Sequence, residues 1–430
     1  MTSNSAAAPR NRALIMTFLV VAYTLNFIDR QIIGILAEPI KQDLQLSDSQ
    51  LGWLGGAAFA LFYTALAIPL AMLADRRDRS WIISIGLAVW SAATALCGLA
   101  QNFWQLFAAR MSVGVGEAAG VAPAYSLISD LYPPEKRARA LATFSLGIPF
   151  GSALGVLFGG LLAARVDWRF SFIVIGLLGV LFAPFFKAVV KDPGHGRVEE
   201  GPRSAAASVG RVFRTIAAKP AFWLLSFGAG TASLVSYGLA FWIPSFFARS
   251  YGLDLVDRSL IFAAILIVGG SAGIWFGGVA GDRLGNVHPR GYAVVPAVAF
   301  AITLPAYLLA FSSNSLLLSS ILFVIPTALG LTWLGPVVTA ITRLVPPEMR
   351  ATAAAMFLFI NNLVGLGAGT LVIGAISDAL TGRYGEEALR YSAMATTLLY
   401  ALAALLMLLA AGRLKRDLAP PSTAHTTSSI

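Results

Sequence analysis

Apolar residues in this chain gather into long runs, and short polar stretches separate these runs. A helix needs about 20 apolar residues to cross a hydrocarbon core about 30 Å thick. Because the runs reach this length, the pattern predicts an all-α membrane protein with twelve transmembrane helices. The first six are expected at residues 13–37, 51–74, 81–100, 104–128, 138–163 and 169–190, and the last six at residues 221–247, 259–281, 291–311, 316–342, 351–378 and 391–412.

A polar segment between the sixth and seventh runs divides the chain into two halves. We expect one six-helix bundle over residues 1–190 and a second over residues 220–415, joined by a cytoplasmic linker over residues 191–219. Within the linker, apolar and basic positions near residues 209–218 indicate an amphipathic helix. Residues 416–430 are polar and are expected to form a cytoplasmic tail.

The distribution of charge indicates the orientation in the membrane. The chain is 57% hydrophobic and 12% charged, whereas a soluble domain is about 25% charged. The net charge of +10 would suit nucleic acid, but the basic residues are spread among short loops, and 22 of the 31 Lys and Arg residues fall on one side of the predicted membrane against seven on the other. Cytoplasmic loops carry such an excess. We therefore expect no nucleic-acid partner, both termini in the cytoplasm, and a cytoplasmic (inner) membrane location.

Cysteine and histidine usage argues against metal or enzyme chemistry. Cys97 is the only cysteine in the sequence, which excludes an intramolecular disulfide framework and a multi-cysteine metal site. His195, His288 and His425 all fall outside the predicted helices. A membrane-embedded acyltransferase or lipid phosphatase needs a convergent His, Cys, Ser or metal site. We therefore expect neither an enzyme nor a bound metal or cofactor.

Charged residues interrupt two of the apolar runs. Asp29 and Arg30 lie inside the first run, and Glu117 lies in the fourth among small residues. A charge at the bilayer centre costs roughly 2.5–3.5 kcal/mol, and such residues mark substrate or proton pathways by default. A buried ion pair that only fixes helix packing is the alternative interpretation.

The two halves of the chain repeat each other. Asp75-Arg76 follows the second predicted helix and Asp282-Arg283 follows the eighth. Residues 131–138, which read Leu-Tyr-Pro-Pro-Glu-Lys-Arg-Ala, follow the fourth, and residues 344–351, Leu-Val-Pro-Pro-Glu-Met-Arg-Ala, follow the tenth. Repeated halves are the signature of transporters whose two bundles rock about a central site. The repeat favours alternating access over a channel.

These features resemble the major facilitator superfamily, whose loop after the second helix has an Asp-Arg motif; here it reads Ala71-Met-Leu-Ala-Asp75-Arg76, with Ala71 in place of the family's leading glycine. A narrower resemblance is to the spinster-like branch, through Asn26-Phe-Ile-Asp29-Arg30, Gly114-Val-Gly-Glu-Ala118 and the run at residues 129–140. This resemblance implies a carrier of lysolipids or sphingoid lipids, with proton coupling suspected. Related bacterial carriers of organic anions share parts of these motifs.

Helical spacing places Tyr23, Asn26, Arg30 and Gly34 on one face of the first helix, which we expect to be a cavity wall. Arg30 cannot lose its proton, and its fork of donors suits a phosphate or carboxylate. We expect Arg30 to pair with Glu117 in the resting cavity. Protonation of Glu117, or of Asp29, would then free Arg30 for an anionic substrate, or substrate binding would displace the proton. A permanent packing bridge is the alternative.

In the second half we place no ionisable residue in the middle of a helix. Trp333 and Asn362, with neighbouring Asn361, are its most amphipathic and most polar candidates for substrate binding. A charged first half and an apolar second half suit an anionic amphiphile. A proton-coupled carrier of small organic anions or drugs on the same fold is the competing hypothesis. We expect a monomer whose partners are the lipid bilayer, protons and the substrate.

Two further patterns concern movement. Asp75, Arg76 and Arg79 with Arg137, and Asp282 and Arg283 with Arg350, are expected to form two inner-face latches, unless the basic residues only mark topology. Four glycines at four-residue spacing in the fifth helix predict a close-packing face, either against the eighth helix or within its own bundle: Gly147, Gly151, Gly155 and Gly159. Arg110 lies two turns before Glu117, where it either takes part in coupling or extends to the outer interface.

Overall fold

The computed structural model describes residues 11–74, 76–194 and 209–418, and no strand occurs in these ranges. The first half contains α1 (Arg12–Ile35), α2 (Ala37–Leu44), α3 (Asp48–Gly52), the π-helical turn η1 (Trp53–Ala57), α4 (Ala58–Ala74), α5 (Arg79–Cys97), α6 (Phe103–Glu117), α7 (Val121–Leu131), α8 (Pro134–Ser145), α9 (Gly147–Arg165) and α10 (Trp168–Val189). The second half contains α11 (Val209–Ala217), α12 (Pro220–Tyr251), α13 (Leu255–Val287), α14 (Gly291–Ser312), α15 (Leu316–Leu329), α16 (Leu334–Arg343), the short η2 (Pro347–Met349), α17 (Arg350–Tyr384), η3 (Gly385–Glu387), α18 (Ala388–Thr397) and α19 (Leu399–Asp417).

The helices agree with the hydrophobic pattern in position, and the all-helical fold class is confirmed for the described residues. Ten stretches among them are long and apolar enough to cross a membrane. The fourth predicted helix falls short of that length because it is broken into α6 and α7, and the eleventh and twelfth are counted as one stretch, Thr352–Asp417. The count of twelve stays a prediction.

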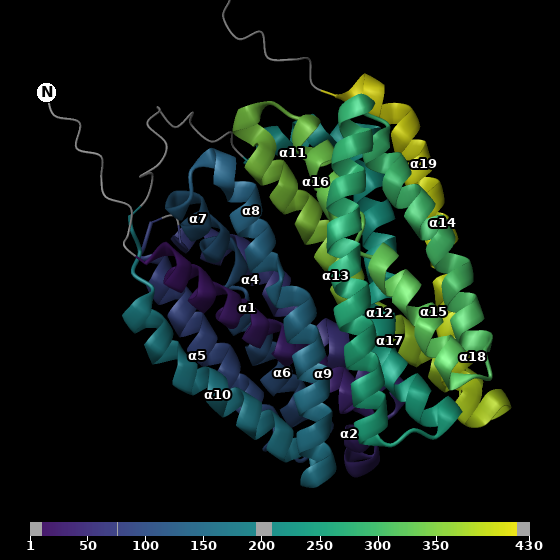
Figure 1. The fold of residues 1–430 in the computed structure, drawn as a ribbon. Helices are drawn as coiled ribbons and strands as arrows, with labels where there is room; N and C mark the ends of the chain where they lie inside the picture. The colour runs from purple at the N-terminus through teal and green to yellow at the C-terminus, as the bar shows by residue number, and fades with distance from the viewer. Residues whose placement is uncertain (1–10, 75, 195–208, 419–430) are drawn as a thin grey trace, which may run out of the picture.

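Figure 1 shows the two halves as two groups of helices side by side, the first coloured purple to teal and the second teal-green to yellow. They meet where α3, η1 and α4 pack on α17 and where α9 packs on α13. The predicted linker helix is α11, which buries Val212 and Ile216. Just after it, Lys219 donates hydrogen bonds to the Leu344 and Asp417 carbonyls, so this part of the linker is held by the second half.

The two ends of the molecule are distinguished by the short helices found there. The linker end carries α11, and the α2 end carries α2 and α18 (Figure 1). Residues 195–208 of the predicted linker and residues 419–430 of the predicted tail lie outside the described residues.

The glycines of α9 form the packing face that their spacing predicts. A Cβ on Gly151 would lie 2.4 Å from the Thr24 carbonyl oxygen of α1, and one on Gly155 would lie 2.7 Å from the Ile28 oxygen. On another face of α9, a Cβ on Gly160 would lie within 3 Å of Ser259 of α13. Helix α9 therefore packs closely both within its own bundle and across to the other.

Candidate functional site

The charged residues predicted in the membrane interior, Arg30 and Glu117, form an ion pair. Arg30 Nε on α1 donates a 2.7 Å hydrogen bond to Glu117 Oε2 at the end of α6. The Glu117 side chain is fully buried, and that of Arg30 is 13% exposed. Glycines bring α6 into position: a Cβ on Gly114 would lie 2.4 Å from a carbonyl oxygen of α4, and one on Gly116 would lie 2.5 Å from a backbone nitrogen of α5. The Gly-x-Gly-Glu sequence thus sets the acid between neighbouring helices.

Each member of this pair keeps an atom free. Arg30 Nη2 and Glu117 Oε1 have no hydrogen-bond partner. The guanidinium carbon lies 5.1, 4.9 and 4.7 Å from the ring centroids of Phe27, Phe59 and Tyr63. Aromatic faces at this distance attract a cation by about 0.5–2 kcal/mol each. The rings therefore hold Arg30 in place while its donors stay available to a second anion.

Arg30 lines a cavity between the two halves. The cavity has about 520 Å³ of space free of protein atoms, part of it open to solvent. Its lining is largely aromatic and aliphatic and comes from both halves: Phe27, Arg30, Gln31, Gly55, Phe59 and Arg110 from the first, and Tyr237, Ala240, Phe241, Leu366 and Thr370 from the second. We call this the central cavity. One cationic group in an apolar space of this size suits a ligand with an anionic head.

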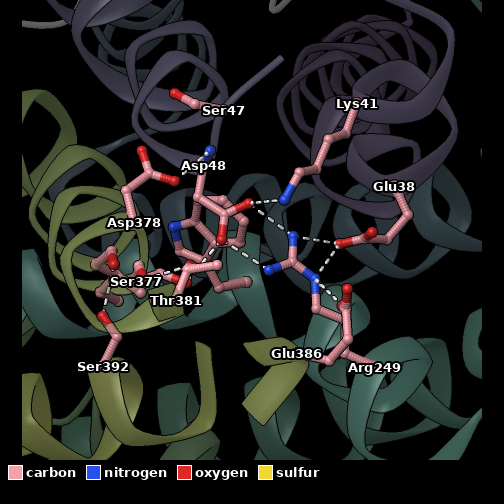
Figure 2. Close-up of polar contacts among 12 residues, drawn as sticks. Glu38, Lys41, Ser47, Asp48, Arg249, Ser377, Asp378, Thr381, Glu386 and Ser392 are labelled. Carbon is pink, nitrogen blue, oxygen red and sulfur yellow. Dashed lines mark hydrogen bonds and ion pairs between the residues drawn. The ribbon is translucent and has the colours of Figure 1, made fainter. Parts of the chain in front are cut away.

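Charged residues join the two halves at the α2 end, and we call these contacts the seal (Figure 2). Arg249, in the last turn of α12, donates from Nη1 and Nη2 to both carboxylate oxygens of Asp48 at 2.7 Å. Its Nε donates to Glu38 at 2.8 Å, and Lys41 donates to Asp48 at 2.6 Å. Arg249 and Asp48 are 6% and 2% exposed. This buried bidentate pair joins the second half to α2 and α3 of the first.

Contacts from α17 add to this seal. Asp378 accepts hydrogen bonds from the backbone N–H groups of Asp48 and Ser49, 3.0 and 2.8 Å away, at the start of α3. An anion at a helix N-terminus is stabilised by the unpaired N–H groups there. Ser377 Oγ donates to Asp48 at 2.6 Å, and a Cβ on Gly374 would lie 2.3 Å from the Asp48 carbonyl oxygen. The two halves are therefore in close contact at this end.

The contact between the two halves is less extensive toward the linker end. The first three residues of α4 are buried, whereas over residues 61–73 Thr64 alone is buried. On the opposing α17, Thr370 and Ile373 are buried. Nearer the linker end, Phe357 and Asn361 are buried by contacts within the second half, while Leu358, Phe359 and Leu363 are exposed. The structure is thus closed at the α2 end and more open at the linker end.

Different helices cover the predicted cavity-wall face of α1 along its length, and the substrate-binding role of Tyr23 and Asn26 stays a prediction. Tyr23 stacks on Phe144 of α8 with ring centroids 4.3 Å apart, and with Asn26 it lines a different cavity inside the first half. Gly34 packs against Phe241 of α12. Of the four predicted wall residues, Arg30 lines the central cavity.

Asp29 and Arg110 lie beside the ion pair but are buried, 2% and 1% exposed. Arg110 Nη1 donates to the Asp29 backbone oxygen at 3.3 Å, while Asp29 Oδ1 has no partner. Because Arg110 is buried and also lines the central cavity, the interpretation as an interfacial arginine is wrong. Asp29 is a second buried acid next to Glu117.

The candidates in the second half lie away from Arg30. Trp333 is 4% exposed and packs edge-on against Phe357. Asn361 accepts a 2.9 Å hydrogen bond from Ser233. Asn362 is half-buried, one helical turn from Leu366 of the central cavity. Neither Trp333 nor Asn362 is among the described lining residues of that cavity, and their role in binding stays a prediction.

The residues expected to form inner-face latches are placed differently. Arg79 is fully buried and bonds to Asp130 of α7 and, at 2.6 Å, to Asp192, which follows α10 at the start of the predicted linker. Arg137 donates to the Ser129 and Tyr132 carbonyls. Arg76 and Arg350 are exposed, while Asp75 and the side chains of Asp282 and Arg283 lie outside the described residues. In this conformation Arg79 and Arg137 fix loops of one half, and the latches stay a prediction for a state closed at the linker end.

Sequence reasoning missed the seal at the α2 end. Glu38, Asp48 and Asp378 stand near predicted helix ends opposite Arg249, and that charge pattern was the available signal. Their pairing joins positions about 200 and 330 residues apart, which spacing along one chain does not reveal. The described residues contain no His, Cys, Asp or Glu cluster suited to a metal ion.

Known proteins with similar sequences are membrane carriers. The family model of the Major Facilitator Superfamily matches residues 19–370. An MFS-type efflux pump of Mycolicibacterium smegmatis is 32% identical over 414 residues, which cover 95% of each chain. Protein spinster homolog 1 of Xenopus tropicalis is 32% identical over 394 residues, which cover 86% of this chain and 74% of that protein.

Solved structures agree with these sequence matches. A bacterial homolog of the human lysosomal transporter Spinster, in an inward-facing and unoccupied conformation, superposes with a TM-score of 0.88 at 31% identity, covering 97% of this chain and all of that one. The inward-facing and occupied conformation gives a TM-score of 0.85 at the same identity. The seal at the α2 end is consistent with this likeness.

Proposed function

Because this chain belongs to the Major Facilitator Superfamily and is a transporter of the spinster-like type, we propose that it carries an anionic amphiphile, a lysolipid or sphingoid-type lipid, by proton-coupled alternating access. The observation that carries the proposal is the Arg30–Glu117 ion pair at the wall of the central cavity. Members of the superfamily are generally not enzymes, which agrees with the sequence-based expectation.

The coupling follows from charge balance at this pair. While Glu117 is ionised, it neutralises Arg30 in a site with little water. When Glu117 takes up a proton, Arg30 is left with an unbalanced charge, and a buried cation without a counter-ion is costly. An anionic head that enters the central cavity restores the balance through the free donors of Arg30. Binding of the proton and binding of the cargo anion are therefore coupled, because each offsets the charge imbalance that the other creates.

The shape of the central cavity favours an amphiphile. Arg30 supplies the charge, and Phe27, Phe59, Phe241 and Leu366 supply an apolar wall. Burying apolar area of a tail contributes about 25 cal/mol per Å², which a short carboxylate cannot gain. A lipid with one chain satisfies both parts of the site.

We place the protein in the cytoplasmic membrane as a monomer, with the linker end and both termini in the cytoplasm. The excess of Lys and Arg in the linker-side loops supports this orientation. The closed α2 end then faces the outside, and the central cavity is reached from the cytoplasm.

Uptake into proteoliposomes tests the coupling. Wild-type protein should concentrate a fluorescent lysophosphatidylglycerol when a pH gradient is imposed. Glu117→Gln should lose this dependence on the gradient and keep exchange between labelled and unlabelled lipid, because the neutral side chain resembles the protonated state. An unchanged response to the gradient in Glu117→Gln contradicts proton coupling at this residue.

The runner-up is a carrier of small organic anions or drugs, favoured by the relative named an MFS-type efflux pump, which this chain matches over 95% of its length. Competition separates the two candidates. If the lipid carrier is correct, a lysolipid displaces a bound fluorescent lysolipid, and short carboxylates at matched concentration do not. The reverse ranking supports the runner-up.

A further inference from the structure

A second cavity lies inside the first half and extends from the ion pair toward the linker end. It has about 280 Å³ of space free of protein atoms and is bounded by α1, α5, α7 and α8. Most of its lining is apolar, as at Ala124 and Phe144, and Asn26 and Trp90 bring polar atoms to it. We call this the side cavity.

The polar groups around the side cavity lack hydrogen-bond partners. Asn26 Oδ1 and Trp90 Nε1, which belong to its wall, are buried and unpartnered. Behind them the same is true of Asp29 Oδ1, Thr94 Oγ1 and Glu117 Oε1. A buried polar atom left without a partner costs about 1–3 kcal/mol. Of these atoms, Asn26 Oδ1 and Trp90 Nε1 belong to the wall, so they are the ones that a water in the side cavity can reach.

The side cavity has room for this water. The space open to the centre of a water molecule is about 20 Å³, and roughly 10–15 Å³ is enough for one. A water placed there would have Trp90 Nε1 as a donor and Asn26 Oδ1 as an acceptor, which are two polar partners. Trp90 and Thr94 also face the Asp29 carboxylate, and Asn26 faces Glu117. Asn26 and Trp90 therefore link the side cavity to both buried acids.

We propose that the side cavity is a water-binding site that carries protons between the linker-end solvent and Asp29 and Glu117, separately from the path of the cargo. The proposal rests on the proton-coupled function above. An amphiphile in the central cavity covers Arg30 and closes that route to Glu117. Entry through the side cavity lets the acid exchange its proton while the cargo is bound.

The charges that face the two acids from each packed helix favour local proton exchange. Arg30 on α1 and Arg110 on α6 face the acids, and Cys97 on α5 faces Asp29. Tyr63 on α4 and Tyr237 on α12 face Arg30. The two arginines balance the two carboxylates, so a proton taken up here adds one positive charge to a neutral group. That added charge is what an anionic cargo neutralises.

Infrared spectroscopy after a pH jump tests the proposal on the full chain in detergent. The carboxyl C=O band that disappears in Glu117→Gln or Asp29→Asn reports protonation of these acids. Ala124→Phe fills the side cavity and should slow the rise of this band about tenfold or more, equivalent to about 1.4 kcal/mol. Affinity for lysophosphatidylglycerol at fixed pH should stay as in the wild type.

The matched control fills the other cavity. Ala240→Phe, in the wall of the central cavity, should weaken lysophosphatidylglycerol binding and leave the rate of protonation unchanged. Trp90→Phe removes the N–H donor, and it should slow protonation even if Ala124→Phe does not fold. Wild-type rates in both Ala124→Phe and Trp90→Phe would overturn the side-cavity route. If the wild type shows no titrating carboxyl band, the proton-coupled function itself fails.

Discussion

At the scale of single residues, two buried arginines differ in how completely they are bonded. Arg79 uses Nε, Nη1 and Nη2, with Asp130, Asp192 and the Gly194 carbonyl among its acceptors. Arg30 bonds through Nε to Glu117, and its Nη2 has no partner. A fully bonded guanidinium fixes the loops around it. A partly bonded one keeps donors for cargo, which is why the proposed function rests on Arg30.

Lowering the pH should reveal how much Asp192 contributes to the free energy of unfolding. Burial alone would raise the pKa of this carboxyl, but hydrogen bonds from the Arg79 side chain and from backbone N–H groups lower it to about 2. The folded value lies below the unfolded value of about 3.9. Its stabilisation is therefore present above about pH 4 and is lost as the pH falls through about 4 to about 2.

Asp192→Asn is expected to lower the free energy of unfolding at pH 7 by about 1–3 kcal/mol, because charge-assisted hydrogen bonds are lost. The free energy of unfolding of this variant should also fall less steeply than that of the wild type as the pH drops below about 4. Thermal unfolding in detergent from pH 7 to about pH 2 measures both effects. Asp257→Asn, at an exposed position, serves as the control. An acid profile of Asp192→Asn equal to that of the wild type would be evidence against the assignment.

At the scale of elements, hydrophobic length predicted the helices well because crossing a bilayer fixes both length and composition. The predicted helix over residues 169–190 is α10, Trp168–Val189, and the predicted amphipathic segment is α11, Val209–Ala217. The break between α6 and α7 was not predicted, since the apolar run continues through it. The break comes directly after Gly116, which packs closely on α5. A hydropathy pattern gives no information about such a contact.

The glycine face of α9 offers a stability test. Gly151→Ala would place a methyl group 2.4 Å from the Thr24 carbonyl oxygen, and overpacking of this kind costs about 1–3 kcal/mol. Gly412→Ala in α19 is the matched control, because no atom lies within 4 Å of its new methyl group. Melting in detergent should show a lower midpoint for Gly151→Ala alone. Equal midpoints would mean that α1 and α9 separate freely.

At the scale of the whole molecule, the family and the two-bundle fold could be read from repeated motifs, but the conformation could not. The repeat shows which loops of the two halves are equivalent, whereas the conformation depends on contacts between the halves. Asp48 with Arg249 and Asp378 with Ser49 make these contacts at the α2 end. The separation of Tyr23 and Asn26 from the central cavity likewise depends on how α8 covers α1.

Removal of Arg249 should open the α2 end. Arg249→Gln leaves Asp48 buried without its bidentate partner, and breaking a buried pair costs about 3–5 kcal/mol. Because the substitution destabilises the conformation that is closed at the α2 end, the population should shift toward a conformation that is open at this end. Electron–electron distances between spin labels at Gln42→Cys and Arg383→Cys, both exposed positions, should lengthen.

The control for this shift is Arg169→Gln. Arg169 pairs with Asp43, a residue 44% exposed, within the first half. Exposed pairs contribute about 0–1 kcal/mol, so its label distances should match the wild type. A wild-type distance distribution in Arg249→Gln would show that the charged seal does not hold the end closed.

Whether a proton on Glu117 frees Arg30 for an anionic head can be measured as the affinity for lysophosphatidylglycerol at a series of pH values. The phosphodiester keeps its negative charge from pH 8 to pH 5, so changes in affinity report the protein. We predict that wild-type binding tightens about tenfold or more on acidification, equivalent to about 1.4 kcal/mol, and that Glu117→Gln binds tightly at every pH. A pH slope in Glu117→Gln equal to that of the wild type would contradict this coupling.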